Sequence, residues 1–172
     1  IEHNNKIDIK INVLKADIDT STWFWYYPSE YVYTGALQSV FLIGYDSNIV
    51  QPYYTDASFI DAGTYTAKVN LVLVNDNYNP VKYESLIWKI NKASVLKPTV
   101  TNTISTYNGE EQVLNIPTST FYTVANNIKT NAGSYEISIS LKNNANMQWQ
   151  DGTTDNVYVS WTIEKAVVEI PN

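Results

Sequence analysis

The side chains that could do chemistry in this chain are aromatic and acidic. The most unusual stretch is Trp23-Phe24-Trp25-Tyr26-Tyr27, with another aromatic residue shortly after it. Consecutive residues of a strand point to opposite faces, so we expect some of these rings to be exposed. Exposed apolar patches often mark interaction sites. The segment therefore predicts a platform for a glycan or a protein partner, with these candidate ligand-binding residues: Trp23, Trp25, Tyr26, Tyr27 and Tyr31.

A simpler interpretation of the same rings stays open. Aromatic side chains are highly buried on average, which favours packing in a core or against a neighbouring unit. Exposure of the rings would distinguish the two interpretations, because a buried ring cannot stack on a sugar.

Acidic and Asn-rich turns provide oxygen atoms of the kind that bind calcium, which takes six to eight of them. The candidate groups are Asp46 with Asn48, Asp76 with Asn75 and Asn77, and Asp151 with Asp155. None follows the Asp-x-Asp-x-Asp-Gly spacing of a calcium loop. Ordinary turn residues that bond their own backbone are the favoured interpretation, and we expect no metal site.

Catalytic chemistry has little support in the sequence. There is no Cys, and the one His is His3, so a thiolate site, a His-based active site and a multi-His metal site are disfavoured. Glu110 and Glu111 are adjacent beside a turn, which is typical of a solvated edge. No Gly-x-Ser-x-Gly motif or Gly-rich phosphate loop occurs. We expect a protein that is not an enzyme, with no catalytic residue and no cofactor.

The net charge and the hydropathy of the chain disfavour two classes of partner, nucleic acids and membranes. The 172 residues carry a net charge of −6, which argues against binding to nucleic acid phosphates. No run of about 18 apolar residues occurs, so we expect no membrane insertion.

The elements that must position these residues are repeated along the chain. Tyr-x-Gly, Ala-Gly-x-Tyr and Trp-x-Ile-x-Lys-Ala occur twice in the same order, with copies 70 to 74 residues apart. A partial third copy of the last motif ends at Lys15-Ala16. The signature residues are Tyr33, Gly35, Gly63, Tyr65, Trp88, Tyr107, Gly109, Gly133, Tyr135 and Trp161.

These repeats predict three segments and an all-β fold. Residues 16–92 and 93–172 form repeats 1 and 2, and residues 1–15 are the closing strand of a preceding repeat or an N-terminal extension. Apolar residues alternate over 65–73, 135–141 and 7–13, which indicates half-buried strands. We expect two tandem immunoglobulin-like β-sandwich repeats in a rod, preceded by a strand from a neighbouring unit, with β-grasp-like modules as the alternative.

The order of the motifs resembles bacterial immunoglobulin-like repeats of the MBG/YDG kind, and Trp149-Gln150-Asp151-Gly152-Thr153-Thr154 is similar to a stretch common in them. The resemblance covers nearly the whole chain. It implies a secreted, extracellular protein of the bacterial cell surface or cell wall, without catalytic residues. Repeat 1 departs from the pattern in its aromatic segment and at Asn77-Tyr78-Asn79-Pro80.

Three functions follow as expectations. The first is a stiff structural spacer, or stalk, in a cell-surface protein, part of an adhesin for cell adhesion. The second is direct binding of a host glycan or protein through the aromatic segment. The third is a phage or other extracellular assembly protein. The expected partners are neighbouring repeats of the same chain and, for the second function, a host surface glycan or protein. The chain begins and ends in strand-like segments, so we expect it to belong to a longer protein.

Overall fold

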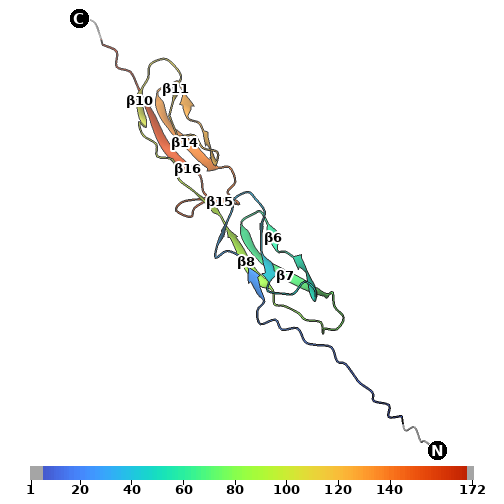
Figure 1. The fold of residues 1–172 in the computed structure, drawn as a ribbon. Helices are drawn as coiled ribbons and strands as arrows, with labels where there is room; N and C mark the ends of the chain where they lie inside the picture. The colour runs from blue at the N-terminus through green and yellow to red at the C-terminus, as the bar shows by residue number, and fades with distance from the viewer. Residues whose placement is uncertain (1–5, 170–172) are drawn as a thin grey trace, which may run out of the picture. The chain divides into compact units, whose positions relative to one another are not determined.

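The structure is a computed structural model that describes residues 6–169 of the chain. His3 therefore lies outside the described residues. Strands are the only regular elements in the described range, β1 to β16, and no helix occurs there. The all-β class predicted from the sequence is confirmed, and the arrangement in several sheets is consistent with β-sandwiches (Figure 1).

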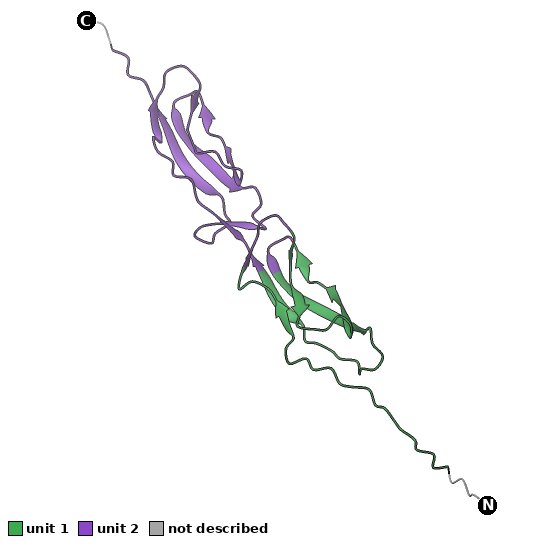
Figure 2. Cartoon of the chain, viewed as in Figure 1, with its two compact units in different colours: residues 1–30, 37–59, 64–89 green, residues 31–36, 60–63, 90–172 purple. Residues whose placement is uncertain are grey.

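The chain divides into two compact units, which Figure 2 shows in green and purple. Unit 1 comprises residues 1–30, 37–59 and 64–89; unit 2 comprises residues 31–36, 60–63 and 90–172. Both units are therefore discontinuous in sequence, and the division falls inside strand β8 (Leu86–Asn91).

The first four-stranded sheet has the order β2-β8-β7-β5. Its other strands are β2 (Tyr31–Val32), β7 (Gly63–Leu73) and β5 (Val50–Thr55). β5 runs antiparallel to β7, whereas β2 runs parallel to the last residues of β8. Every second residue of β7 is shielded, as expected for a strand with one face against a core.

Two short antiparallel ribbons complete unit 1. β1 (Phe24–Tyr26) pairs with β4 (Phe41–Ile43), and β3 (Gln38–Ser39) pairs with β6 (Ser58–Phe59). Only Val40 separates β3 from β4.

The core of unit 1 contains two aromatic groups. Trp23, Leu42 and Val50 are buried together in one of them. In the other, Phe59 stacks on Tyr65 with ring centroids 3.7 Å apart, and the ring of Trp88 lies 5.4 Å from Tyr65.

The second four-stranded sheet lies in unit 2 and has the order β10-β16-β14-β12. Its strands are β10 (Ile104–Thr106), β16 (Val157–Glu164), β14 (Gly133–Leu141) and β12 (Tyr122–Ala125). β10 is parallel to β16, and the other two pairings are antiparallel.

Two ribbons accompany this sheet. β11 (Gln112–Val113) pairs antiparallel with β13 (Ile128–Lys129), and β9 (Ala93–Val95) pairs parallel with β15 (Met147–Trp149). The core between them contains two buried clusters, one around Trp149 and one around Trp161.

Equivalent hydrogen bonds recur in the two halves of the chain. Val40 donates to the carbonyl of Ala57, and Leu114 donates to that of Asn127, each at 2.9 Å. Tyr33 donates to the carbonyl of Asn91, and Tyr107 to that of Glu164, each at 2.8 Å. Asp56 and Asn126, 70 residues apart, both take positive φ. The strand order thus repeats together with its hydrogen-bond register.

The alternating segment near the N-terminus forms no strand within the described residues. Residues 6–15 are exposed, and Ile7, Ile9 and Ile11 each expose about four fifths of their surface or more. An alternating pattern pairs only where a sheet edge is offered to it. In residues 6–169 the nearest pairing is a single parallel bridge between Ala16 and Tyr78.

Residues 6–169 contain no helix with the length and apolar character needed to span a membrane.

Candidate functional site

Three exposed aromatic rings share one face of the β1·β4 ribbon. Phe24 pairs with Ile43, and Tyr26 pairs with Phe41, so these side chains lie on the same side because directly opposed residues share a face. The side chains of Phe24, Tyr26 and Phe41 are 53%, 51% and 41% exposed. The rings of Tyr26 and Phe41 lie 5.1 Å apart. We call Phe24, Tyr26 and Phe41 the aromatic face.

The opposite side of the ribbon is anchored in unit 1. Trp25 Nε1 donates a hydrogen bond of 2.8 Å to the carbonyl of Glu84, and its ring lies 5.9 Å from that of Tyr54. The hydroxyl of Tyr54 accepts a hydrogen bond from the backbone N–H of Leu42 at 3.1 Å. Burial raises the pKa of Tyr54, and the hydrogen bond with Leu42 opposes this shift in part. These contacts hold the aromatic face in place from behind.

The remaining predicted ligand-binding residues are placed differently. Trp23 is buried in the core, and its carbonyl accepts a hydrogen bond from the hydroxyl of Tyr83, so its ring is closed to a ligand. Tyr27 is 45% exposed just after β1. Tyr31 is half-buried in β2 and belongs to unit 2. Of the five residues, Tyr26 alone belongs to the aromatic face.

Sequence reasoning missed Phe41 as a candidate. Its proximity to Tyr26 depends on the β1·β4 register, which joins segments 15 residues apart. The sequence carries no signal that singles out Phe41, because residues 40–43 are all apolar and show no alternation of polar and apolar residues.

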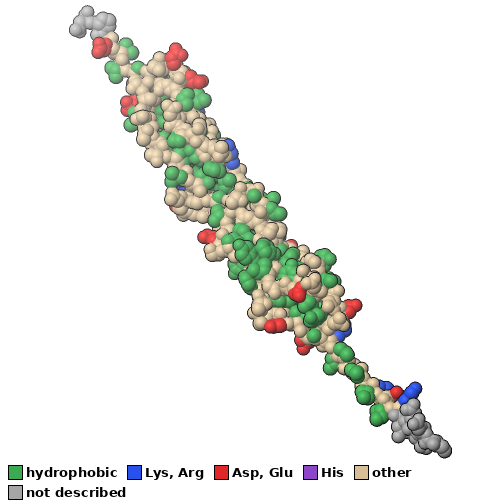
Figure 3. Space-filling model, in the orientation of Figure 1, with side chains coloured by type: hydrophobic (Ala, Val, Ile, Leu, Met, Phe, Trp, Pro, Cys, Tyr) green, Lys and Arg blue, Asp and Glu red, His purple; other side chains and the backbone are tan. Residues whose placement is uncertain are grey.

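The aromatic face itself consists of uncharged side chains. On the side of the molecule that Figure 3 draws, hydrophobic side chains reach the surface mostly among uncharged atoms, with acidic groups beside some of them. An uncharged aromatic surface suits stacking on a sugar ring or packing against an apolar protein surface.

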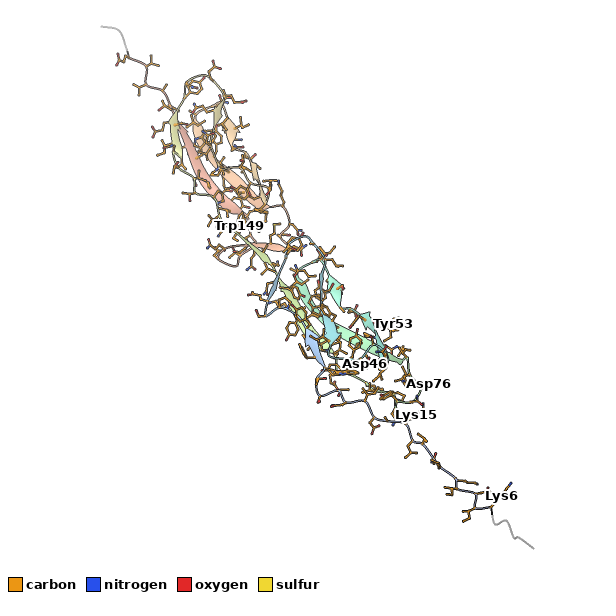
Figure 4. All side chains as sticks on the ribbon, viewed as in Figure 1. Lys6, Lys15, Asp46, Tyr53, Asp76 and Trp149 are labelled. Carbon is orange, nitrogen blue, oxygen red and sulfur yellow. The ribbon has the colours of Figure 1, made fainter. Side chains whose placement is uncertain are left out.

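In two of the three acidic or Asn-rich turns considered as calcium candidates, a side-chain oxygen accepts a backbone N–H of the same turn. Asp46 Oδ1 accepts the backbone N–H of Asn48 at 2.8 Å, and Asn75 Oδ1 accepts that of Asn77 at 3.0 Å. Figure 4 shows Asp46 and Asp76, both in unit 1. Over residues 6–169, no three His or acidic side chains gather in a group suited to a metal ion.

The third acidic turn contains an ion pair. Asp151 Oδ2 lies 2.5 Å from Lys97 Nζ, and Asp151 Oδ1 accepts hydrogen bonds from the backbone and hydroxyl of Thr153. The hydrogen bond from Lys97, followed by those from Thr153, lowers the pKa of Asp151 well below its usual range. This turn follows Trp149, whose indole N–H donates to the carbonyl of Asp155 at 2.8 Å; Figure 4 labels this side chain.

A shallow hollow of about 440 Å³ lies in unit 2. It is lined by residues 94–99 and by residues 117–119, 121 and 122, including the exposed side chains of Leu96 and Phe121. Its lining contains one charged residue, Lys97, and no acid-base pair, so its chemistry is that of a weak apolar contact.

Comparisons with protein-family models, curated proteins and solved structures match none of them to this chain. The class is therefore defined by the fold alone: an all-β protein of several small sheets. The resemblance to immunoglobulin-like repeats stays a prediction, and its functional consequences are proposals.

Proposed function

We propose that the chain consists of two tandem immunoglobulin-like β-sandwich repeats that act as a stiff, non-enzymatic spacer. The observation that carries this proposal is the recurrence of strand order together with register. β2-β8-β7-β5 and β10-β16-β14-β12 each place a short strand parallel to the last long strand of the sheet. Such a duplication is typical of repeat proteins, in which identical modules extend a chain.

The connection between the repeats supports stiffness. β8 ends at Asn91 and β9 begins at Ala93, so Lys92 alone separates two strands. Flexible linkers are rich in Gly and Ser and run over many residues. A one-residue connection leaves little freedom to the chain.

The proposed setting is a stalk of a bacterial cell-surface protein, in which neighbouring repeats of the same chain are the main partners. The motifs shared with the MBG/YDG repeats favour this setting.

A distance measurement tests the spacer. The chain has no Cys, so spin labels attach only to Cys residues that are introduced. The substitutions Tyr53→Cys in unit 1 and Tyr158→Cys in unit 2 suit this purpose, because each Tyr is 59% exposed. We expect one narrow distance distribution by pulsed electron resonance. A control pair within unit 2, at Tyr158 and Val113, reports the width due to the labels alone. A distribution much broader than that of the control would exclude a stiff spacer.

The aromatic face favours a second function, which is direct binding of a host glycan or protein. The side chains of Phe24, Tyr26 and Phe41 expose about half of their surface and lie on an anchored ribbon. Rigid exposed aromatic side chains are frequent anchors of binding sites.

Glycan-array and surface-protein binding by the full chain tests this second function. We expect Tyr26→Ser combined with Phe41→Ser to abolish binding while the thermal melting curve barely moves. Ile104→Ser, at a residue that is 66% exposed in unit 2, is the matched control. Equal binding by all three proteins would assign the aromatic face no part in recognition.

A further inference from the structure

Asn146 is the single buried polar residue among the residues that the structure describes. Its Nδ2 donates a 2.7 Å hydrogen bond to Asp61 Oδ1, and its Oδ1 accepts one of 2.7 Å from the backbone N–H of Ala62. All three residues belong to unit 2. Burying an amide is costly unless it is hydrogen-bonded, so these two bonds explain why the buried position tolerates an Asn.

Two further contacts within unit 2 hold the turn that contains Asn146. Asn143 Nδ2 lies 3.5 Å from the hydroxyl of Tyr33, and Lys92 Nζ donates a 2.7 Å hydrogen bond to the carbonyl of Asn144. The turn of residues 143–146 is thus seated on Tyr33, Asp61 and Ala62. We call this arrangement the asparagine lock.

The turn of residues 143–146 has a counterpart in unit 1. Ala93 donates to the carbonyl of Asn146, and Ala16 donates to the carbonyl of Asn77. Each of these Asn residues also donates its N–H to the side chain of an earlier Asn: Asn146 to Asn143, and Asn77 to Asn75. Asn77 therefore occupies the position of Asn146, but its side chain is exposed.

The surface that receives the turn has a copy as well. Tyr107, Asn131 and Ala132 stand 74, 70 and 70 residues after Tyr33, Asp61 and Ala62. Tyr107 is 39% exposed, and Asn131 is exposed on the loop before β14. The chain thus presents both halves of a second lock.

We propose that Tyr107, Asn131 and Ala132 form a docking surface for the Asn-ended turn of a further copy of this repeat, and that Asn77 is the matching residue of such a turn. The inference rests on the proposed tandem-repeat function. The occupant's Asn Oδ1 accepts the N–H of Ala132, and its Nδ2 donates to the side-chain oxygen of Asn131. Asn131 replaces the carboxylate of Asp61 with a neutral amide, so this second lock is weaker than the first.

Amide hydrogen exchange of the full chain tests the existing lock. Asn146→Ala removes the acceptor of the Ala62 N–H, so exchange at Ala62 should accelerate about tenfold or more. Asn144→Ala is the matched control, because the carbonyl of Asn144 makes its contact and its side chain is exposed. Unchanged exchange at Ala62 in Asn146→Ala would overturn the lock itself.

A fusion of residues 1–165 to residues 16–172 tests the docking surface. Its joint, Lys165 followed by Ala16, reproduces the Lys-Ala pair found at residues 92–93. We expect exchange at Ala132 of the first copy to slow about tenfold relative to the unfused chain. Asn77→Ala in the second copy should remove this protection, whereas Asn70→Ala, at an exposed residue of β7, should leave it intact.

The outcomes separate this inference from the proposed function. Protection of Ala132 that depends on Asn77 supports the docking surface. Absent protection, or protection that persists in Asn77→Ala, overturns it. The spin-label distances within the unfused chain decide the spacer independently, since they do not involve Tyr107, Asn131 or Ala132.

Discussion

The indole ring of Trp149 lies against the phenol ring of Tyr122, with ring centroids 6.0 Å apart and planes inclined by 49°. Tyr135 and Trp161 repeat the same separation and inclination in the same unit. The two pairs belong to separate buried clusters that share half-buried neighbours, Val100, Ile116, Val124 and Val159. Each pair therefore anchors its own part of the unit 2 core.

Truncation of this anchor should destabilise unit 2 strongly. The side chain of Trp149 is fully buried, and Trp→Ala changes in cores cost about 3–5 kcal/mol because they leave a cavity. We expect Trp149→Ala to lower the urea midpoint of unit 2, measured by amide exchange of β14 and β16. Tyr158→Ala, at an exposed position of β16, should change it little. Similar midpoints for the two variants would contradict the packing.

Gly44 should be far more sensitive to substitution than Gly109. Both have positive φ, which costs other residues about 1–2 kcal/mol. A Cβ at Gly44 would also lie 2.3 Å from the carbonyl oxygen of Thr22, whereas at Gly109 it would meet nothing within 4 Å. We expect Gly44→Ala to lower the melting temperature clearly more than Gly109→Ala. Equal shifts would show that the backbone near Thr22 yields freely.

Asp151 should make the protein less stable in acid. Its pKa is lowered in the folded protein by Lys97 and Thr153, so unfolding takes up a proton below the ordinary value of 3.8. The stabilisation is complete above that pH and is lost as the pH falls through the lower folded value. NMR titration should show the pKa of the Asp151 carboxyl rising towards 3.8 in Lys97→Met. A value already near 3.8 in the native chain would contradict the ion pair.

Tyr54 should make the protein less stable at alkaline pH. Burial raises its pKa above the ordinary value of 10.0, so the unfolded chain releases the phenol proton first. Stability is complete below pH 10.0 and falls as the pH rises through the folded value. We expect a smaller alkaline loss in Tyr54→Phe, measured by urea midpoints, than in Tyr158→Phe. An identical pH dependence would place Tyr54 in solvent.

One long strand of each four-stranded sheet was predictable because its signal is local. Tyr65, Ala67 and Val69 alternate with polar residues, and β7 lies there; Tyr135 to Leu141 alternate likewise, and β14 lies there. Residues 7–13 carry the same pattern and form no strand. Alternation reports that a segment suits a sheet, but pairing depends on an edge elsewhere in the chain.

The candidate site was predictable only in part. The run from Trp23 to Tyr27 indicated that some rings would be exposed, yet the sequence does not state which. Trp23 is buried before β1 begins, and Phe41 joins Tyr26 through a register set across the ribbon. The asparagine lock escaped prediction for the same reason, since Asn146 and Asp61 are 85 residues apart.

The parallel pairing of β10 with β16 has a mechanical consequence. The two strands belong to the beginning and the end of one repeat and point in the same direction. Tension applied to the two ends of that repeat therefore drags them past each other along their length, and their hydrogen bonds must break together in shear. In two antiparallel strands joined by a tight turn and pulled at their free ends, the hydrogen bonds would break one after another, at a much smaller force.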